Sequence, residues 1–99
     1  MARNGMRPIH PGEILREDVL GELGLSANAF AKALGVPANR ITGILHGKRA
    51  VSADTAMRLA RYLGSTPEFW LDLQTAYDLR VAEIERGAEI KRSVSPRAA

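Results

Sequence analysis

The chain has 99 residues, which suits one small domain, and its 45% hydrophobic content argues against disorder throughout. It contains no cysteine, which excludes a disulfide framework and a thiolate metal site. The net charge is only +3, and no apolar run approaches the roughly 20 residues of a membrane span, so we expect a cytoplasmic protein without membrane contact.

The first helices are predicted from their caps and stops. Pro11 suits the first turn of a helix that ends at Gly24. Ser26 is a good N-cap for a second helix that stops at Gly35, and a third helix follows Pro37. No segment alternates apolar and polar residues as a half-buried strand does.

Two further helices complete the pattern. One is capped by Ser52 and ends at Gly64, and the last begins at Pro67. This last helix carries an apolar stripe at spacings of three and four residues: Trp70, Leu73, Tyr77, Val81 and Ile84. The predicted fold class is all-α with five helices, in a domain over residues 9–86 between flexible tails at 1–8 and 87–99.

Charge is distributed unevenly along the chain. Between Glu22 and Asp54 there is no acidic residue, whereas this interval holds Lys32, Arg40, Lys48 and Arg49. Such a window suits a polyanion. Residues 68–89 carry the opposite excess, with six acids against two arginines. That segment suits a basic partner, although solvation of an exposed helical surface is the simpler interpretation.

The second and third helices are short, and "LGVPA" joins them tightly. A helix presented in this way fits the DNA major groove. In the third helix, Asn39 can read adenine, Arg40 can read guanine or hold phosphate, and Thr42 can reach a base or a phosphate. Each also has a structural interpretation, because Asn39 can cap the helix and the other two can be solvated surface residues.

The ends of this helix pair suit the DNA backbone. Ser26 and Asn28 begin the second helix, where backbone amides and short polar side chains meet phosphate. Lys48, Arg49 and His46 follow the third helix and can hold phosphates, although loop charges of this kind can also be simply solvated.

Catalysis is not indicated. Neither His10 nor His46 lies in a pattern with a serine or cysteine nucleophile, and no glycine-rich phosphate loop follows a strand. The two histidines are too far apart in sequence for a metal motif. We therefore expect no enzyme activity, no metal and no cofactor.

Four stretches together resemble the HigA family of antitoxins, within the wider Xre/Cro-type helix-turn-helix group: "HPGEIL" at 10–15, "LGVPANRI" at 34–41, "HGKRAVSADTAMRLARYLG" at 46–64 and "TPEFWLDLQTAYDL" at 66–79. The first and last are the more specific, because a DNA-binding motif does not require them. The resemblance implies a λ-repressor-like domain that dimerises, binds a palindromic operator in double-stranded DNA and represses its own operon. It also implies a HigB-type toxin partner, a small basic ribonuclease that cleaves messenger RNA.

By this resemblance the recognition helix runs from about Pro37 to His46. Five residues would face DNA, namely Ala38, Asn39, Arg40, Thr42 and Gly43, and four would hold phosphates, namely Ser26, Asn28, Lys32 and Lys48. Ala38 and Gly43 depart from the longer polar side chains that Cro-like repressors often carry, so base readout rests on fewer groups. Gly43 can allow close approach to DNA or be merely tolerated, and Gly43→Ala is expected to stabilise the fold in either case.

The last helix is expected to form the dimer interface through Trp70, Leu73, Tyr77, Val81 and Ile84. Alternatively, Trp70 and Leu73 complete the core of their own domain, so we expect the early residues to point inward and the later ones to meet the partner. Two other functions remain open: a stand-alone repressor without a toxin, and a protein-interaction module with weak DNA binding. RNA binding is disfavoured, because the basic window lacks base-stacking aromatics.

Overall fold

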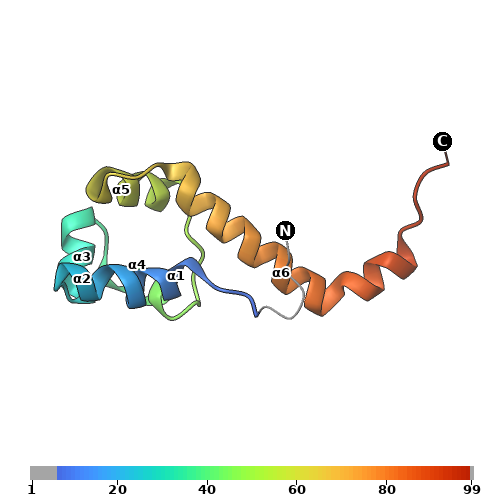
Figure 1. The fold of residues 1–99 in the computed structure, drawn as a ribbon, viewed down its shortest axis with the longest axis horizontal. Helices are drawn as coiled ribbons and strands as arrows, with labels where there is room; N and C mark the ends of the chain where they lie inside the picture. Colours follow the sequence, from blue (N-terminus) through green and yellow to red (C-terminus); the bar gives the residue numbers. More distant parts are fainter. Residues whose placement is uncertain (1–6, 99) are drawn as a thin grey trace.

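The computed structural model describes residues 7–98, all of whose regular structure is helical (Figure 1). The elements are α1 (Pro11–Ile14), the π-helical stretch η1 (Leu15–Leu20), α2 (Gly21–Leu23), α3 (Ala27–Leu34), α4 (Ala38–Leu45), α5 (Ala53–Leu63) and α6 (Pro67–Ser93). The first three follow one another without a break and form the first predicted helix. The prediction of an all-α fold with five helices is therefore confirmed.

The predicted caps set the helix starts. The side-chain oxygens of Ser26, Ser52 and Thr66 each accept a hydrogen bond from the backbone N–H three residues later. Gly35 has a φ of 72° and ends α3 in the left-handed conformation that an L side chain avoids. These local signals place the starts of α3, α5 and α6 and the end of α3.

The core lies where the first helical segment, α3, α4, α5 and the first turns of α6 meet. Its fully buried side chains include Leu15, Phe30, Ile41 and Leu59. Trp70 covers this cluster from α6 and is only 3% exposed, with its indole N–H donating to Ser65 Oγ at 2.9 Å. Trp70 therefore completes the core of its own domain, as expected for the early residues of the stripe, because the first turns of α6 pack against α5. A part for Trp70 in a dimer interface stays a prediction.

The rest of the apolar stripe on α6 becomes progressively more exposed. Leu73, Tyr77 and Val81 are half-buried, whereas Ile84 is 58% exposed. Figure 1 shows the C-terminal half of α6 projecting away from the other helices. The domain therefore uses the start of this helix for itself and leaves the later part of the stripe uncovered.

The helix also runs further than predicted. Residues 87–93, expected to belong to a flexible tail, continue α6 to Ser93. Ala, Glu, Lys and Arg in this segment favour a helix through their intrinsic propensity, and Lys91 and Arg92 suit its C-terminal end. Most of the predicted tail at 1–8 lies outside the described residues, but Arg7 forms an ion pair with Glu13.

Among residues 7–98, none of the helices combines the length and the apolar character that crossing a bilayer requires.

Candidate nucleic-acid interface

Helices α3 and α4 form the predicted helix-turn-helix. The turn between them is closed by the backbone N–H of Val36, which donates to the carbonyl of Ala31 at 3.0 Å. One side of α4 is buried through Ile41, Ile44 and Leu45. Its opposite side therefore points out of the domain, as a recognition helix must.

The predicted DNA-binding residues all lie on the outer surface of this unit or on the loop that follows it. Nine are exposed: Ser26, Asn28, Lys32, Pro37, Ala38, Asn39, His46, Lys48 and Arg49. Three are half-buried: Arg40, Thr42 and Gly43. The structure thus brings together side chains from the start of α3, from α4 and from the following loop.

Asn39 is an exposed residue inside the first turn of α4. The N-cap of this helix is Pro37, which makes no side-chain cap hydrogen bond. The alternative interpretation of Asn39 as the helix cap is therefore wrong. Thr42 is partly engaged, because its hydroxyl donates to the Asn39 carbonyl at 3.3 Å.

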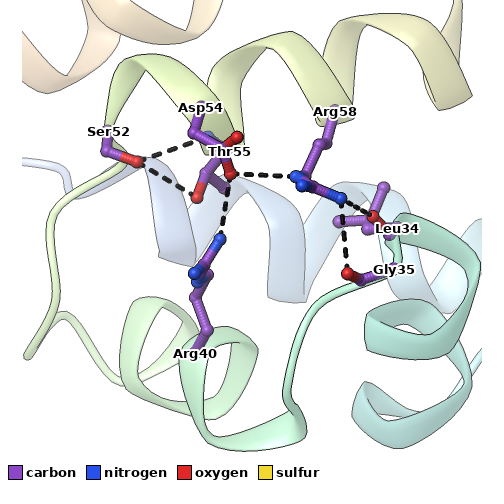
Figure 2. Close-up of polar contacts among 7 residues, drawn as sticks. All are labelled: Leu34, Gly35, Arg40, Ser52, Asp54, Thr55 and Arg58. Carbon is purple, nitrogen blue, oxygen red and sulfur yellow. Dashed lines mark hydrogen bonds and ion pairs between the residues drawn. The ribbon is translucent and has the colours of Figure 1, made fainter.

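Arg40 does not extend freely from α4. Its Nη1 lies 3.0 Å from Asp54 Oδ2 in the first turn of α5, and Arg58 Nε lies 2.8 Å from the same oxygen (Figure 2). Arg58 Nη1 also donates to the carbonyls of Leu34 at 2.9 Å and Gly35 at 3.3 Å. The hydrogen bonds from Arg58 and then Arg40 lower the pKa of Asp54, so this carboxylate stays ionised to a lower pH than an ordinary aspartate does.

The loop after α4 folds back over Gly43. The backbone N–H groups of Lys48 and Arg49 donate to the Gly43 carbonyl at 2.9 and 3.1 Å. A Cβ added at Gly43 would lie 3.2 Å from Arg49 Cβ, a tight contact that requires the loop at Arg49 to shift slightly. The gain in helix propensity expected for Gly43→Ala is therefore opposed by a contact with the chain's own loop.

Sequence reasoning missed two arginines that hold the helix-turn-helix. Arg16, in η1, donates from Nη1 to the carbonyl of Leu45 at 2.7 Å, and Arg58 serves the end of α3 in the same way. Each satisfies carbonyls that the C-terminal end of a helix leaves without an intrahelical partner. Nothing in the periodicity points to these bonds, because their partners lie 29 and 24 residues away in the sequence.

The first and last family-like stretches meet at the end of α4. The buried His10 accepts a hydrogen bond at Nδ1 from the Gly12 N–H at 2.9 Å, and its ring meets that of Tyr77 edge-on at 4.8 Å. The buried Gln74 accepts from the Val51 N–H at 2.8 Å and donates to Asp78 at 3.0 Å. These contacts attach both α1 and the loop after α4 to α6.

We expect acid to weaken the fold through His10. Burial lowers its pKa, against smaller raising effects of Asp78 and of a hydrogen bond to the Arg49 backbone. The unfolded chain, with a histidine pKa of about 6.5, then takes up the proton more readily than the folded one. The free energy of unfolding is therefore unaffected by His10 above a pH of about 6.5. It decreases as the pH falls from that value toward the lower pKa of His10 in the folded state.

The measurement is urea unfolding at several values between about pH 5 and pH 7.5, above the range in which ordinary carboxylates titrate. His10→Asn keeps an acceptor near the Gly12 N–H and should flatten the dependence, whereas His46→Gln, at an exposed histidine, should not. Equal slopes in His10→Asn and the unaltered protein would contradict the assignment.

In the part of the chain that the structure describes, no three His, Asp or Glu side chains gather in a way that could hold a metal ion. The surface consists instead of an exposed helix side flanked by Lys32, Lys48 and Arg49. This arrangement suits an extended anionic partner such as duplex DNA better than a small ligand.

Comparison with known proteins agrees with this geometry. The helix-turn-helix family model matches residues 15–71. A solved HigA-family addiction module antidote protein from Coxiella burnetii is 53% identical, with a TM-score of 0.88 over 93% of this chain and 100% of that one. Antitoxin GraA, solved in complex with its operator, is 56% identical, with a TM-score of 0.89 over 100% of both chains. Antitoxin HigA-1 of Vibrio cholerae is 39% identical over 80% of this chain and 74% of its own length.

These relatives are antitoxins with a helix-turn-helix domain, a non-enzymatic group, which confirms the expectation that the chain is not an enzyme. The predicted resemblance is confirmed as well, over the helix-turn-helix and over the flanking stretches that meet at His10 and Tyr77. The chain belongs to the HigA family of helix-turn-helix antitoxins.

Proposed function

We propose that this chain is a DNA-binding antitoxin that represses its own operon as a homodimer and neutralises a HigB-type toxin by direct binding. The observation that carries DNA binding is the exposed polar side of α4, flanked by the basic loop at Lys48 and Arg49. The operator complex of antitoxin GraA, a relative at 56% identity over the whole of both compared chains, supports placing α4 on DNA, and a recognition helix of this kind enters the major groove.

The homodimer is supported by the uncovered part of α6. Leu79, Ile84 and Ile90 are large apolar side chains that are at least half exposed. Burial of such side chains is a main driving force of association, and a second copy is the simplest partner for a two-fold interface. Two recognition helices would then lie roughly 34 Å apart, one turn of duplex DNA.

Toxin neutralisation is supported by charge. Exposed acids along α6, among them Glu68, Asp72, Glu85 and Glu89, complement a basic ribonuclease. A stand-alone repressor, the first alternative, would use the same DNA-binding surface on α4 but would have no toxin partner. A protein-interaction module would depend on α6 and not on α4. Each of these functions would be exercised in the cytoplasm.

Footprinting on the DNA upstream of the gene tests the repressor function. We expect protection of two half-sites about one helical turn apart, and light scattering should give the mass of a dimer. Absence of protection even at low salt would reject autorepression.

Co-expression with the adjacent gene product separates the remaining alternatives. Co-purification of a small basic protein without DNA supports the antitoxin function. Operator protection without any such complex favours the stand-alone repressor, and a complex without operator protection favours the protein-interaction module.

A further inference from the structure

The Asp54 carboxylate joins three helices through one oxygen. It accepts from Arg40 on α4 and from Arg58 on its own helix, and Arg58 in turn holds the last carbonyls of α3. Figure 2 shows the Arg40 side chain reaching from α4 up to this carboxylate. Asp54, which lies outside the helix-turn-helix, therefore links α3, α4 and α5.

This arrangement restricts where the Arg40 guanidinium can go. The Arg40 side chain is only 27% exposed, although its neighbour Asn39 is exposed. Asp54 cannot easily follow a departing arginine, because Arg58 holds it and is itself fixed by the carbonyls of Leu34 and Gly35. The two arginines and one aspartate still carry a net positive charge, so the cluster attracts phosphate without freeing Arg40 to search for a base.

We propose that Asp54 is a positioning residue for operator recognition: it holds Arg40 against α5, so that Arg40 fixes α4 in the groove and adds charge near the DNA backbone while Asn39 reads the bases. This inference rests on the proposed DNA-binding function and adds to it a specificity residue on α5. In this proposal Arg40 acts on the DNA backbone and on helix placement, which favours the phosphate-holding alternative for Arg40 over guanine readout.

Asp54→Asn should reduce discrimination between DNA sequences. A released Arg40 can pair with phosphates of any duplex, and the lost negative charge also favours any duplex. Affinity for a scrambled duplex should rise while the operator gains less, so that the ratio of the two affinities falls about 5- to 10-fold.

The experiment measures fluorescence anisotropy with the footprinted operator and a scrambled duplex of equal length at several salt concentrations. Glu22→Gln is the matched control, because it removes the same charge from an exposed residue of α2 that belongs to none of the proposed DNA, dimer and toxin surfaces. Its affinity ratio should equal that of the unaltered protein. Asp54→Glu retains a carboxylate and should restore most of the ratio that Asp54→Asn loses.

A double variant shows whether Asp54 acts through Arg40. In an Arg40→Ala background, Asp54→Asn should no longer change the ratio, and Arg40→Ala alone should weaken all single-base-pair variants of the operator equally. The proposal is overturned if the ratio of operator to scrambled affinity in Asp54→Asn equals that in Glu22→Gln. It is also overturned by an unchanged effect of Asp54→Asn in the Arg40→Ala background, or by a loss in Arg40→Ala confined to one base pair.

Failure of this inference can be told apart from failure of the proposed function. If the unaltered protein binds no duplex, both are rejected. If the unaltered protein binds the operator, the proposed function stands, and the affinity ratios of the variants then test the role of Asp54. Thermal melts followed by circular dichroism confirm that each variant is folded, and the Arg40→Ala profile provides the test if Asp54→Asn does not fold.

Discussion

Replacing Gly12 by alanine is expected to destabilise the domain by about 3 kcal/mol or more. At Gly12 the backbone of α1 touches the last turn of α4. A Cβ built there would lie 1.7 Å from the Ile44 carbonyl oxygen and 2.6 Å from the carbonyl carbon. Neither is a flexible side chain, so the helices would have to separate.

That separation would weaken the contacts that join the two segments, among them the hydrogen bond from Arg16 Nη1 to the Leu45 carbonyl at 2.7 Å. Urea unfolding measures the loss. Gly21→Ala is the matched control, because Gly21 lies in the same helical segment with open space around its Cβ direction.

We expect Gly21→Ala to stabilise the domain by about 0.5–1 kcal/mol through helix propensity. Similar effects of the two substitutions would contradict the close approach of α1 and α4. Gly12→Ala should also weaken DNA binding, since α1 packs against α4, the helix that is proposed to enter the major groove.

Asn39→Ala is expected to lower operator affinity at least about 30-fold with little effect on stability. A bidentate contact to a base is worth about 1–3 kcal/mol, and a dimer makes it in both half-sites. Because Asn39 is exposed and does not cap α4, its removal leaves the fold intact. The loss should be confined to the operator, so binding to a scrambled duplex should be almost unchanged.

Lys48→Ala provides the contrasting result. Loss of a phosphate contact should weaken binding to every duplex and reduce the slope of log affinity against log salt by about two for a dimer. Equal losses of operator and scrambled binding in Asn39→Ala would show that Asn39 holds the backbone and does not read bases.

Much of the candidate interface was accessible from local sequence signals. Ser26, Gly35 and Pro37 define the ends of α3 and the start of α4, and the spacing of Ile41, Ile44 and Leu45 defines the buried side of α4. Once that side is known, the exposure of Asn39 and Ala38 follows from helix geometry. The ion pair between Arg40 and Asp54 could not be predicted from these local signals. Asp54 is 14 residues away in the sequence, and its position near Arg40 depends on how α5 packs.

The sequence by itself determined the all-α fold, the helix-turn-helix and the position of its outward side, because capping and helical periodicity are local properties. Tertiary structure alone decided which residues support that side. Arg16 and Arg58 reach carbonyls on other helices, and Gly12 lies against the α4 backbone. The reason is physical: these contacts join residues distant in sequence, and only the packing angles of the helices bring them within hydrogen-bonding or van der Waals distance.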